Sequence, residues 1–326
     1  MLSIFSPSNY APFNIALEEY IFTTFTEDCF LLYINQPCII VGRFQNTIAE
    51  INYQWVQEHD IPVVRRLTGG GAVFHDLGNL NYSFLMQTDE SDNNGFSKYT
   101  APILAVLHDL GVPARLEGRN DLTINGLKFS GNARMGQNGK TLQHGTILFS
   151  SHVESLNRAL KVNPIKFSDK AVKSVRARVT NVSDHLPQPM KLNDFIALVR
   201  AKVHSMYPDT KDYYLTIDDR EKVQALVDSK YDCWDWNFGK SPQYNLANAI
   251  RTESGTIEFY LDVSNGIISS LRIFGDFFST RDLSELEELF SGVEHTPERV
   301  REVFEKGDYR AYFGPVDLQE LVKGMF

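Results

Sequence analysis

Several features are scarce in this sequence of 326 residues, and each scarcity argues against a class of protein. Only three cysteines occur, Cys29, Cys38 and Cys233, without metal-ligand or redox spacing, so we expect a reduced, cytoplasmic protein. Basic residues number 32 against 41 acidic ones, and the net charge of −9 argues against general nucleic-acid binding. No apolar run approaches the ~18 residues of a membrane span, and the N-terminus lacks the basic segment of a secretory signal.

The glycine cluster at residues 69–71 fits neither the G-x-x-x-x-G-K-[ST] phosphate loop nor the G-x-G-x-x-G dinucleotide fingerprint. Arg65 and Arg66 precede it after an apolar run, and His75 and Asp76 follow a second apolar run. Consecutive glycines leave no Cβ to keep a ligand away, and arginines offer planar cationic forks for phosphate or carboxylate. A turn with solvated arginines is the simpler interpretation of the cluster alone. The arginines and the His-Asp pair together favour a site for an anionic small molecule.

A second group of residues is expected on a tight hairpin. Asn125-Gly126 is a strong two-residue turn signal, which predicts pairing between strands 121–124 and 127–130. The hairpin carries Lys128. A lysine next to a turn is more often a solvated charge, so only the neighbouring motifs favour a role for Lys128 in the site.

The stretch 65–76 resembles the signature R-R-x-[ST]-G-G-G-x-V-[FY]-H-D of lipoate–protein ligases of the A type, with Leu67 and Thr68 in its variable places. Further segments resemble the same family: 14–19 its N-L-A-x-E-E, 42–46 its G-R-x-Q-N, 128–133 its K-x-x-G-x-A, 144–145 its H-G and 174–181 its S-V-x-x-R-V-x-N. The resemblance covers nearly the whole chain.

This resemblance implies an ATP-dependent ligase. Lipoate would attack the α-phosphorus of ATP to give lipoyl-AMP and pyrophosphate, and the mixed anhydride would acylate a lysine on an acceptor protein. The implied acceptors are apo lipoyl domains of 2-oxoacid dehydrogenase complexes or the glycine cleavage H protein. Because the first step brings an anion to an anion, it needs fixed cations and donors where negative charge grows. The implied enzyme is a monomer.

The resemblance also implies roles for single residues. Lys128 is the catalytic lysine. ATP would be held by Arg66, Gly71, Ala72, Val73, Phe74 and Lys128. Lipoate would be held by Leu17, Arg66, Gly70, Gly71, His75, Lys128 and His144, with Val41 and Val73 completing the apolar slot. Mg²⁺ would cover the triphosphate, with Asp121 as its ligand or neighbour. The basic segment 166–182 would be a mobile loop over the adenylate.

The expected fold class is α+β, in two domains. The catalytic domain, 1–240, would contain mixed or antiparallel sheets with flanking helices, as in class II synthetases. Its strand 80–86 alternates apolar and polar residues, which predicts a half-buried strand. Its helix 12–24 carries Glu18 and Glu19, which would be solvated carboxylates without the resemblance. A small α+β accessory domain, 241–326, is predicted from a hairpin followed by helices.

Three alternatives remain open from the sequence. A biotin ligase would be expected to show a G-R-G-R-x-x-x-G loop, which is absent. An octanoyl or lipoyl transferase without ATP would need an activated cysteine near the lysine and glycine motifs. A non-catalytic module that binds lipoyl domains would need neither ATP nor an activated cysteine. The sequence does not distinguish lipoate from octanoate, because either acid fits an apolar slot.

Overall fold

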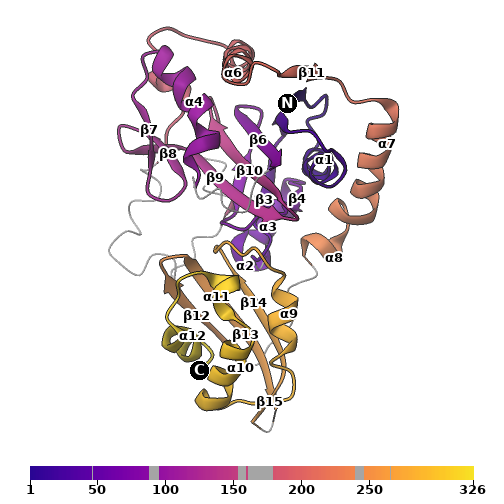
Figure 1. Cartoon of the computed structure of the whole chain (residues 1–326), viewed down its shortest axis with the longest axis vertical. Helices are drawn as coiled ribbons and strands as arrows, with labels where there is room; N and C mark the ends of the chain where they lie inside the picture. Colours follow the sequence, from indigo (N-terminus) through magenta and orange to yellow (C-terminus); the bar gives the residue numbers. More distant parts are fainter. Residues whose placement is uncertain (46, 88–94, 153–158, 161–178, 239–245, 265) are drawn as a thin grey trace.

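The computed structural model describes all residues except 46, 88–94, 153–158, 161–178, 239–245 and 265. Figure 1 shows a large upper body, formed by the chain up to α8, and a smaller lower body formed by residues from 246 onward. The expected α+β class is confirmed by the mixture of sheets and flanking helices. Among the described helices, none has the length and apolar character needed to cross a bilayer.

The large body is organised around an eight-stranded mixed sheet. Its strands lie in the order β11 (Lys211–Tyr213), β1 (Leu2–Phe5), β2 (Cys29–Ile34), β6 (Asn79–Gln87), β10 (Lys140–Leu148), β9 (Leu127–Gln137), β8 (Asp121–Ile124) and β7 (Ala114–Glu117). β1 pairs in parallel with β2 and β11, whereas β2, β6, β10 and β9 form an antiparallel series. The predicted hairpin is present between β8 and β9, and a second hairpin joins β9 and β10.

Helices cover both faces of this sheet. Helices α4 (Ser97–Asp109) and α6 (Leu192–Met206) pack on one face, where Phe30 and Phe84 lie. Helices α1 (Ala11–Thr24) and α7 (Ile217–Leu226) pack on the other, where Leu31 and Leu85 lie. Alternate residues of one strand point to opposite faces, so β6 is buried on both. The prediction of a half-buried strand was therefore wrong, because the polar residues of β6 face the site rather than solvent.

A three-stranded sheet lies beside the large one and carries the glycine motif. Its order is β4 (Val63–Arg65), β3 (Cys38–Val41) and β5 (Val73–His75), so the glycines at 69–71 connect its two outer strands. The short helices of the large body are α2 (Thr47–Glu50), α3 (Tyr53–Glu58), η2 (Val182–His185), η3 (Val227–Tyr231) and α8 (Trp234–Asn237).

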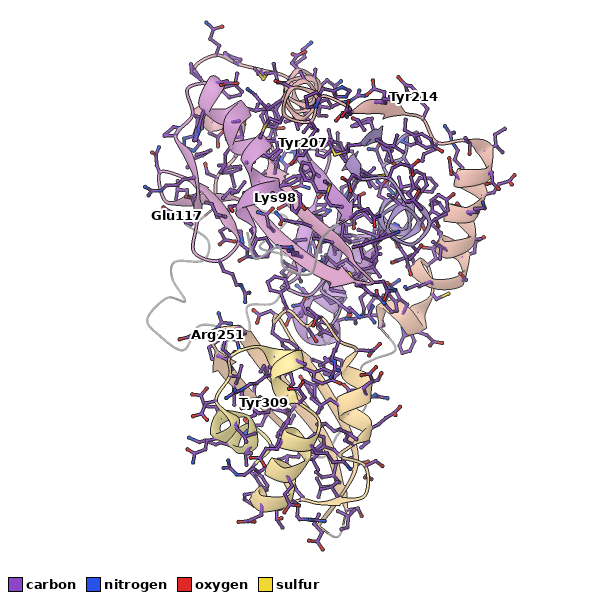
Figure 2. All side chains as sticks on the ribbon, in the orientation of Figure 1. Lys98, Glu117, Tyr207, Tyr214, Arg251 and Tyr309 are labelled. Atoms are coloured by element: carbon purple, nitrogen blue, oxygen red, sulfur yellow. The ribbon has the colours of Figure 1, made fainter. Side chains whose placement is uncertain are left out.

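The small body is a four-stranded sheet covered by helices. The strand order is β12 (Leu246–Thr252), β13 (Gly255–Ser264), β14 (Ile267–Gly275) and β15 (Val293–Glu294). Its helices are α9 (Leu283–Glu288), α10 (Pro297–Lys306), α11 (Tyr309–Phe313) and α12 (Leu318–Gly324). Figure 2 shows Arg251 of β12 on the edge of this body that faces the large one, and Tyr309 among its helices. The predicted boundary between 240 and 241 lies outside the described residues.

Candidate functional site

A cavity of about 150 Å³ opens between the large sheet, α1 and the three-stranded sheet. It brings together most of the residues that the sequence singled out: Arg66, Gly70, Gly71, Ala72, Val73, His75, Lys128 and His144. Other polar lining residues were missed, because in the sequence they look like ordinary solvent-facing positions of strands and turns: Asn81, Asn120, Asn132 and Thr146.

Four of the predicted residues do not line the cavity. Leu17 is fully buried in the core beside α7, and the neighbouring Ile15 lines the cavity instead. The side chains of Val41 and Phe74 pack in a separate apolar cluster of the three-stranded sheet, so neither lines the cavity. Asp121 lies at the rim, against Lys128.

The cavity runs across the large sheet. Tyr33 on β2 pairs with Asn81 on β6, and Asn81 pairs with Thr146 on β10. The Thr146 hydroxyl in turn accepts a hydrogen bond from the N–H of Gly131 on β9 at 3.3 Å. This row spans three strand spacings of about 4.8 Å, which places Tyr33 and Gly131 roughly 14 Å apart. Lys128 therefore belongs to the β9 end of the cavity and Tyr33 to the β2 end.

An irregularity in the strand explains the K-x-x-G spacing. Residues three apart in a regular strand point to opposite faces, but the register between β8 and β9 shifts at Leu122 and Thr123, so that Lys128 and Gly131 share a face. The Lys128 side chain crosses Gly131 so closely that a Cβ there would lie 3.0 Å from Nζ and 3.1 Å from Cε. A larger residue at 131 would therefore push the Lys128 ammonium aside by a few tenths of an ångström. The Lys128 ammonium lies 2.7 Å from Asp121 Oδ1.

The two signature arginines have different environments. Arg65 points away from the cavity, and its guanidinium donates to the carbonyls of Gly42, Arg43, Gln45, Trp236 and Asn237 and to the Thr47 hydroxyl. Burial lowers the pKa of Arg65 to about 10, so it stays cationic at neutral pH. Arg65 therefore ties residues 42–45 and the start of α2 to α8, and it does not offer its fork to a ligand.

Arg66 lines the cavity and holds the glycine motif in shape. Its Nη2 donates to the carbonyls of Gly69 and Gly71 at 2.7 and 2.9 Å, and its Nη1 donates to the carbonyl of Ile40. Burial lowers the pKa of Arg66 to about 10, which leaves it cationic at neutral pH. A fixed positive charge is thus present at the wall of the cavity.

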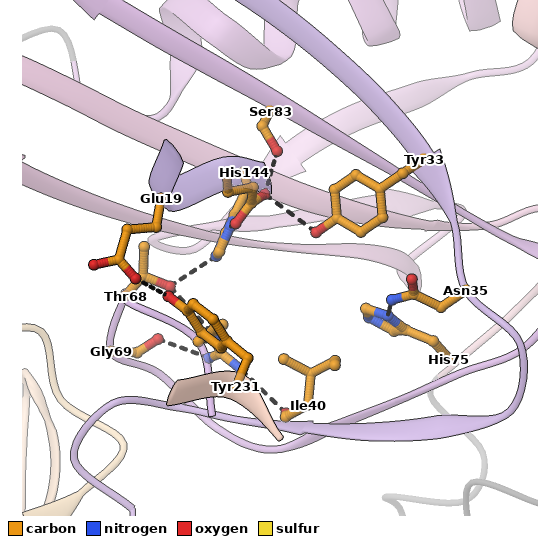
Figure 3. A network of polar contacts seen from close by, with 12 residues as sticks. Glu19, Tyr33, Asn35, Ile40, Thr68, Gly69, His75, Ser83, His144 and Tyr231 are labelled. Atoms are coloured by element: carbon orange, nitrogen blue, oxygen red, sulfur yellow. Dashed lines mark hydrogen bonds and ion pairs between the residues drawn. The ribbon is translucent and has the colours of Figure 1, made fainter. Parts of the chain in front are cut away.

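Behind the cavity lies a buried polar network around Glu18, which is fully buried and not solvated. Its carboxylate accepts hydrogen bonds from Ser83, from Tyr33 at 3.1 Å and from His144 Nδ1 at 2.9 Å. His144 Nε2 then lies 2.7 Å from the Thr68 hydroxyl, as Figure 3 shows. Burial alone would raise the pKa of Glu18, but the charge of His144 and these hydrogen bonds outweigh it and lower that pKa. The network fixes His144 and Thr68 at the cavity wall.

His75 has a defined tautomer. The amide nitrogen of Asn35 donates to His75 Nδ1 at 3.0 Å, as drawn in Figure 3, so the proton of the neutral ring is on Nε2. Burial lowers the pKa of His75 to about 3, and the positive charge of Arg66 acts in the same direction. The ring is therefore neutral at neutral pH.

The small body reaches the site at the glycine motif. A Cβ on Gly69 would lie 2.3 Å from the carbonyl oxygen of Phe277, so only glycine permits this close approach. Phe44 stacks on Phe277 with ring centroids 5.5 Å apart, and the Arg119 guanidinium lies 4.5 Å from the ring centre of Phe278. Phe277 and Phe278 of the small body thus lie directly against the signature loop.

Three further predictions concern groups at the edge of the site. The basic loop 166–182 lies largely outside the described residues, although its downstream end is tied to Lys128 by the Thr180 N–H at 2.9 Å. No cluster of three metal-ligating side chains occurs among the described residues, and Asp121 is the one predicted magnesium contact near Lys128. The three cysteines are unpaired, and none lines the described cavity.

Comparisons with known proteins agree with this geometry. A family model described as the lipoyl protein ligase A/B catalytic domain matches residues 10–204, and one described as the bacterial lipoate protein ligase C-terminus matches residues 241–325. Lipoate–protein ligase 1 of Staphylococcus aureus is 40% identical over 314 residues, covering 96% of this chain and 95% of that protein. The lipoate-protein ligase LplJ of Bacillus subtilis is also 40% identical, over 95% of each chain.

Solved structures are similar as well. The crystal structure of P. falciparum LipL1 in complex with lipoate superposes with a TM-score of 0.79 at 26% identity, covering 94% of each chain. A lipoate-protein ligase A bound with ATP superposes with a TM-score of 0.64 at 25% identity, covering 73% of this chain and 99% of that one.

Proposed function

The chain belongs to the lipoyl protein ligase A/B family, and from that premise we propose that its cavity holds lipoate with the carboxylate at Lys128. The protein is an ATP-dependent ligase that activates lipoate as lipoyl-AMP, releasing pyrophosphate, and transfers the lipoyl group to a lysine of an acceptor protein. One observation carries the residue assignment: Lys128, Arg66 and the glycine motif lie around one cavity, and Tyr33 lines its β2 end.

In the first step, the lipoate carboxylate attacks the α-phosphorus and pyrophosphate leaves. Lys128 offsets the negative charge of the carboxylate and the α-phosphate, which would otherwise repel each other. Arg66 adds a second fixed charge and also orients the signature loop. The Gly71 carbonyl accepts a hydrogen bond from Arg66 and so points toward it. In a trans peptide the N–H of the next residue, Ala72, points the opposite way, so it faces away from Arg66 and is available for phosphate.

In the second step, the acceptor amine attacks the acyl carbonyl and AMP leaves. Lys128 stabilises the charge that returns to the phosphate. An apo lipoyl domain is the proposed acceptor, since the similar bi-partite lipoate protein ligase of Thermoplasma acidophilum belongs to a lipoylation system together with its E2 lipoyl domain. The two-domain boundary at 240, the reduced cytoplasmic setting and the monomeric state remain part of the proposal.

Mg²⁺ is proposed to accompany ATP. The described residues offer one carboxylate near Lys128 and no three-ligand cluster, so the triphosphate oxygens themselves would be its main ligands and Asp121 a supporting one. When bound, the ion would neutralise charge on the leaving pyrophosphate. The chain's own contribution remains to position Lys128, Arg66 and the loop.

The small body is proposed to shape the ATP side of the site. None of its described residues lines the cavity, yet the Phe277 carbonyl approaches Gly69 and the Phe278 ring lies against Gly69 and Arg119. Its contribution should therefore be greater in activation than in transfer from a preformed adenylate.

One experiment tests the function. The protein is incubated with lipoate and ATP, and AMP and pyrophosphate are measured with and without an apo lipoyl domain. We expect pyrophosphate release without the acceptor, and AMP together with a lipoylated lysine once it is added. An acceptor whose target lysine is replaced by arginine is the control. Transfer that proceeds from an acyl thioester or acyl carrier without ATP would instead support a transferase.

A further inference from the structure

A chain of buried amides directs one hydrogen-bond donor into the cavity. The two hydrogens of the Asn14 amide nitrogen point to the Ser8 carbonyl at 2.9 Å and to Asn35 Oδ1 at 2.8 Å, and the Ile34 carbonyl lies farther from this nitrogen at 3.4 Å. With its oxygen facing Asn14, Asn35 turns its nitrogen to His75 Nδ1. Backbone carbonyls thus fix the orientation of both asparagines, and through them the tautomer of His75. The ring must present Nε2–H on its other side.

The Nε2–H of His75 is a buried donor at the wall of the cavity. His75 is 97% buried, lines the cavity, and its Nε2 has no hydrogen-bond partner among the described residues. Ile40 and Val73 line the same cavity, and neither side chain can accept a hydrogen bond. A buried donor without an acceptor is costly, so a ligand that brings an acceptor to this point gains an advantage over one that does not.

The position of His75 identifies which part of the ligand it meets. Asn35 directly follows β2, so His75 lies at the β2 end of the cavity, about three strand spacings from the β9 end where Lys128 lies. The proposed function places the acid's carboxylate at Lys128. The far end of the acyl chain then lies beside His75.

We propose that His75 is a specificity-determining residue whose Nε2–H donates to a sulfur of the dithiolane ring and so selects lipoate over octanoate. Thioether-like sulfur is a weak acceptor, whereas the terminal methyl group of octanoate accepts nothing. A hydrogen bond of this strength, together with relief of the unpaired donor, corresponds to a preference of about 3–10-fold in binding. This inference rests on the proposed function, because it requires the carboxylate to lie at Lys128.

Binding without ATP tests the inference directly. The probes are lipoate, octanoate and 5-cyclopentylpentanoate, which has the ring size and chain length of lipoate but no sulfur. Equilibrium binding to the full-length protein should favour lipoate over the cyclopentyl acid by about 3–10-fold. Equal binding of these two acids would overturn the proposal without requiring any variant.

Two variants separate hydrogen bonding from packing. His75→Phe keeps a flat ring and removes the donor, so the ratio of lipoate to cyclopentyl affinity should fall to near one. His75→Gln restores an N–H donor and should recover part of the ratio. A purely structural role would weaken both acids equally and leave the ratio unchanged, which would refute the proposal. Pyrophosphate release from lipoate and ATP is measured separately, so that a failure of activation is not mistaken for a failure of selectivity.

Discussion

Lys128→Ala is expected to stop lipoyl-AMP formation while leaving the fold intact. The Lys128 side chain is 41% exposed and its partner Asp121 is 39% exposed, and such exposed pairs stabilise proteins by about 0–1 kcal/mol. The melting temperature should therefore fall by no more than about 4 °C. Loss of a charge contact made in the transition state should by contrast slow activation by about 100–1000-fold.

The assay is pyrophosphate release from lipoate and ATP without an acceptor, run beside thermal unfolding of the same sample. Lys140→Ala is a matched control. Lys140 lies on the neighbouring strand β10, does not line the cavity, and donates to the carbonyls of Phe22 and Phe25 at 3.1 and 2.7 Å. Removing it should cost about 1–3 kcal/mol of stability and leave the activation rate near that of the parent. If Lys128→Ala forms lipoyl-AMP at the parental rate, the central assignment is wrong.

Three further outcomes are expected. Gly69→Ala places a Cβ 2.3 Å from the Phe277 carbonyl, so adenylate formation from ATP should fall by about 100-fold, whereas transfer from preformed lipoyl-AMP should fall far less; equal losses in both steps would contradict this. The control is Gly136→Ala, whose Cβ would meet its nearest neighbour at 3.8 Å and whose activity should also fall far less. Replacing all three cysteines should leave ATP-dependent ligation in place. Burial raises the pKa of Cys29 to about 12 and raises that of Cys38 as well, so neither thiol ionises readily to a nucleophile. An acyl-enzyme that is trapped in the parent protein and lost in Cys38→Ser would contradict this. Because the pKa of Glu18 is lowered in the folded protein, the ionised carboxylate stabilises the fold at pH values above the ordinary pKa of 4.5, and this stabilisation is lost as the pH falls further. Glu18→Gln should therefore lower the unfolding free energy at neutral pH by roughly 3–5 kcal/mol and weaken its fall at acid pH, as measured by urea titration. An unchanged acid profile would argue against a lowered pKa.

Elements with local signals were predictable from the sequence. The helix expected at 12–24 is α1, and the Asn125-Gly126 turn has positive φ at both residues, as a two-residue hairpin loop requires. β1 and β11 escaped prediction, because short edge strands depend on partners that lie far away in the sequence. The burial of β6 on both faces depends on α1 and α4 covering opposite sides of the sheet, which its own alternation does not reveal.

The site was predictable where a motif was dense, and less so elsewhere. Lys128 and the signature residues meet at one cavity as the motifs implied. The different environments of Arg65 and Arg66 were hidden, because adjacent residues of one strand point to opposite sides and the sequence does not say which side is the cavity. Glu18 looked like a surface carboxylate since its partner His144 lies 126 residues downstream.

The parallel pairing of β1 with β11 has a consequence for synthesis. Leu2 pairs with Lys211, so a ribosome working at 5–20 residues per second needs roughly 10–40 s to produce the second strand after the first. During this interval β1 can pair with β2, but its other edge exposes a row of unpaired N–H and C=O groups. Until β11 is made, the first strand of the nascent chain therefore has an edge that another chain could pair with. A fusion partner placed before Met1 would lie beside β11, the last strand of the large sheet to be synthesised.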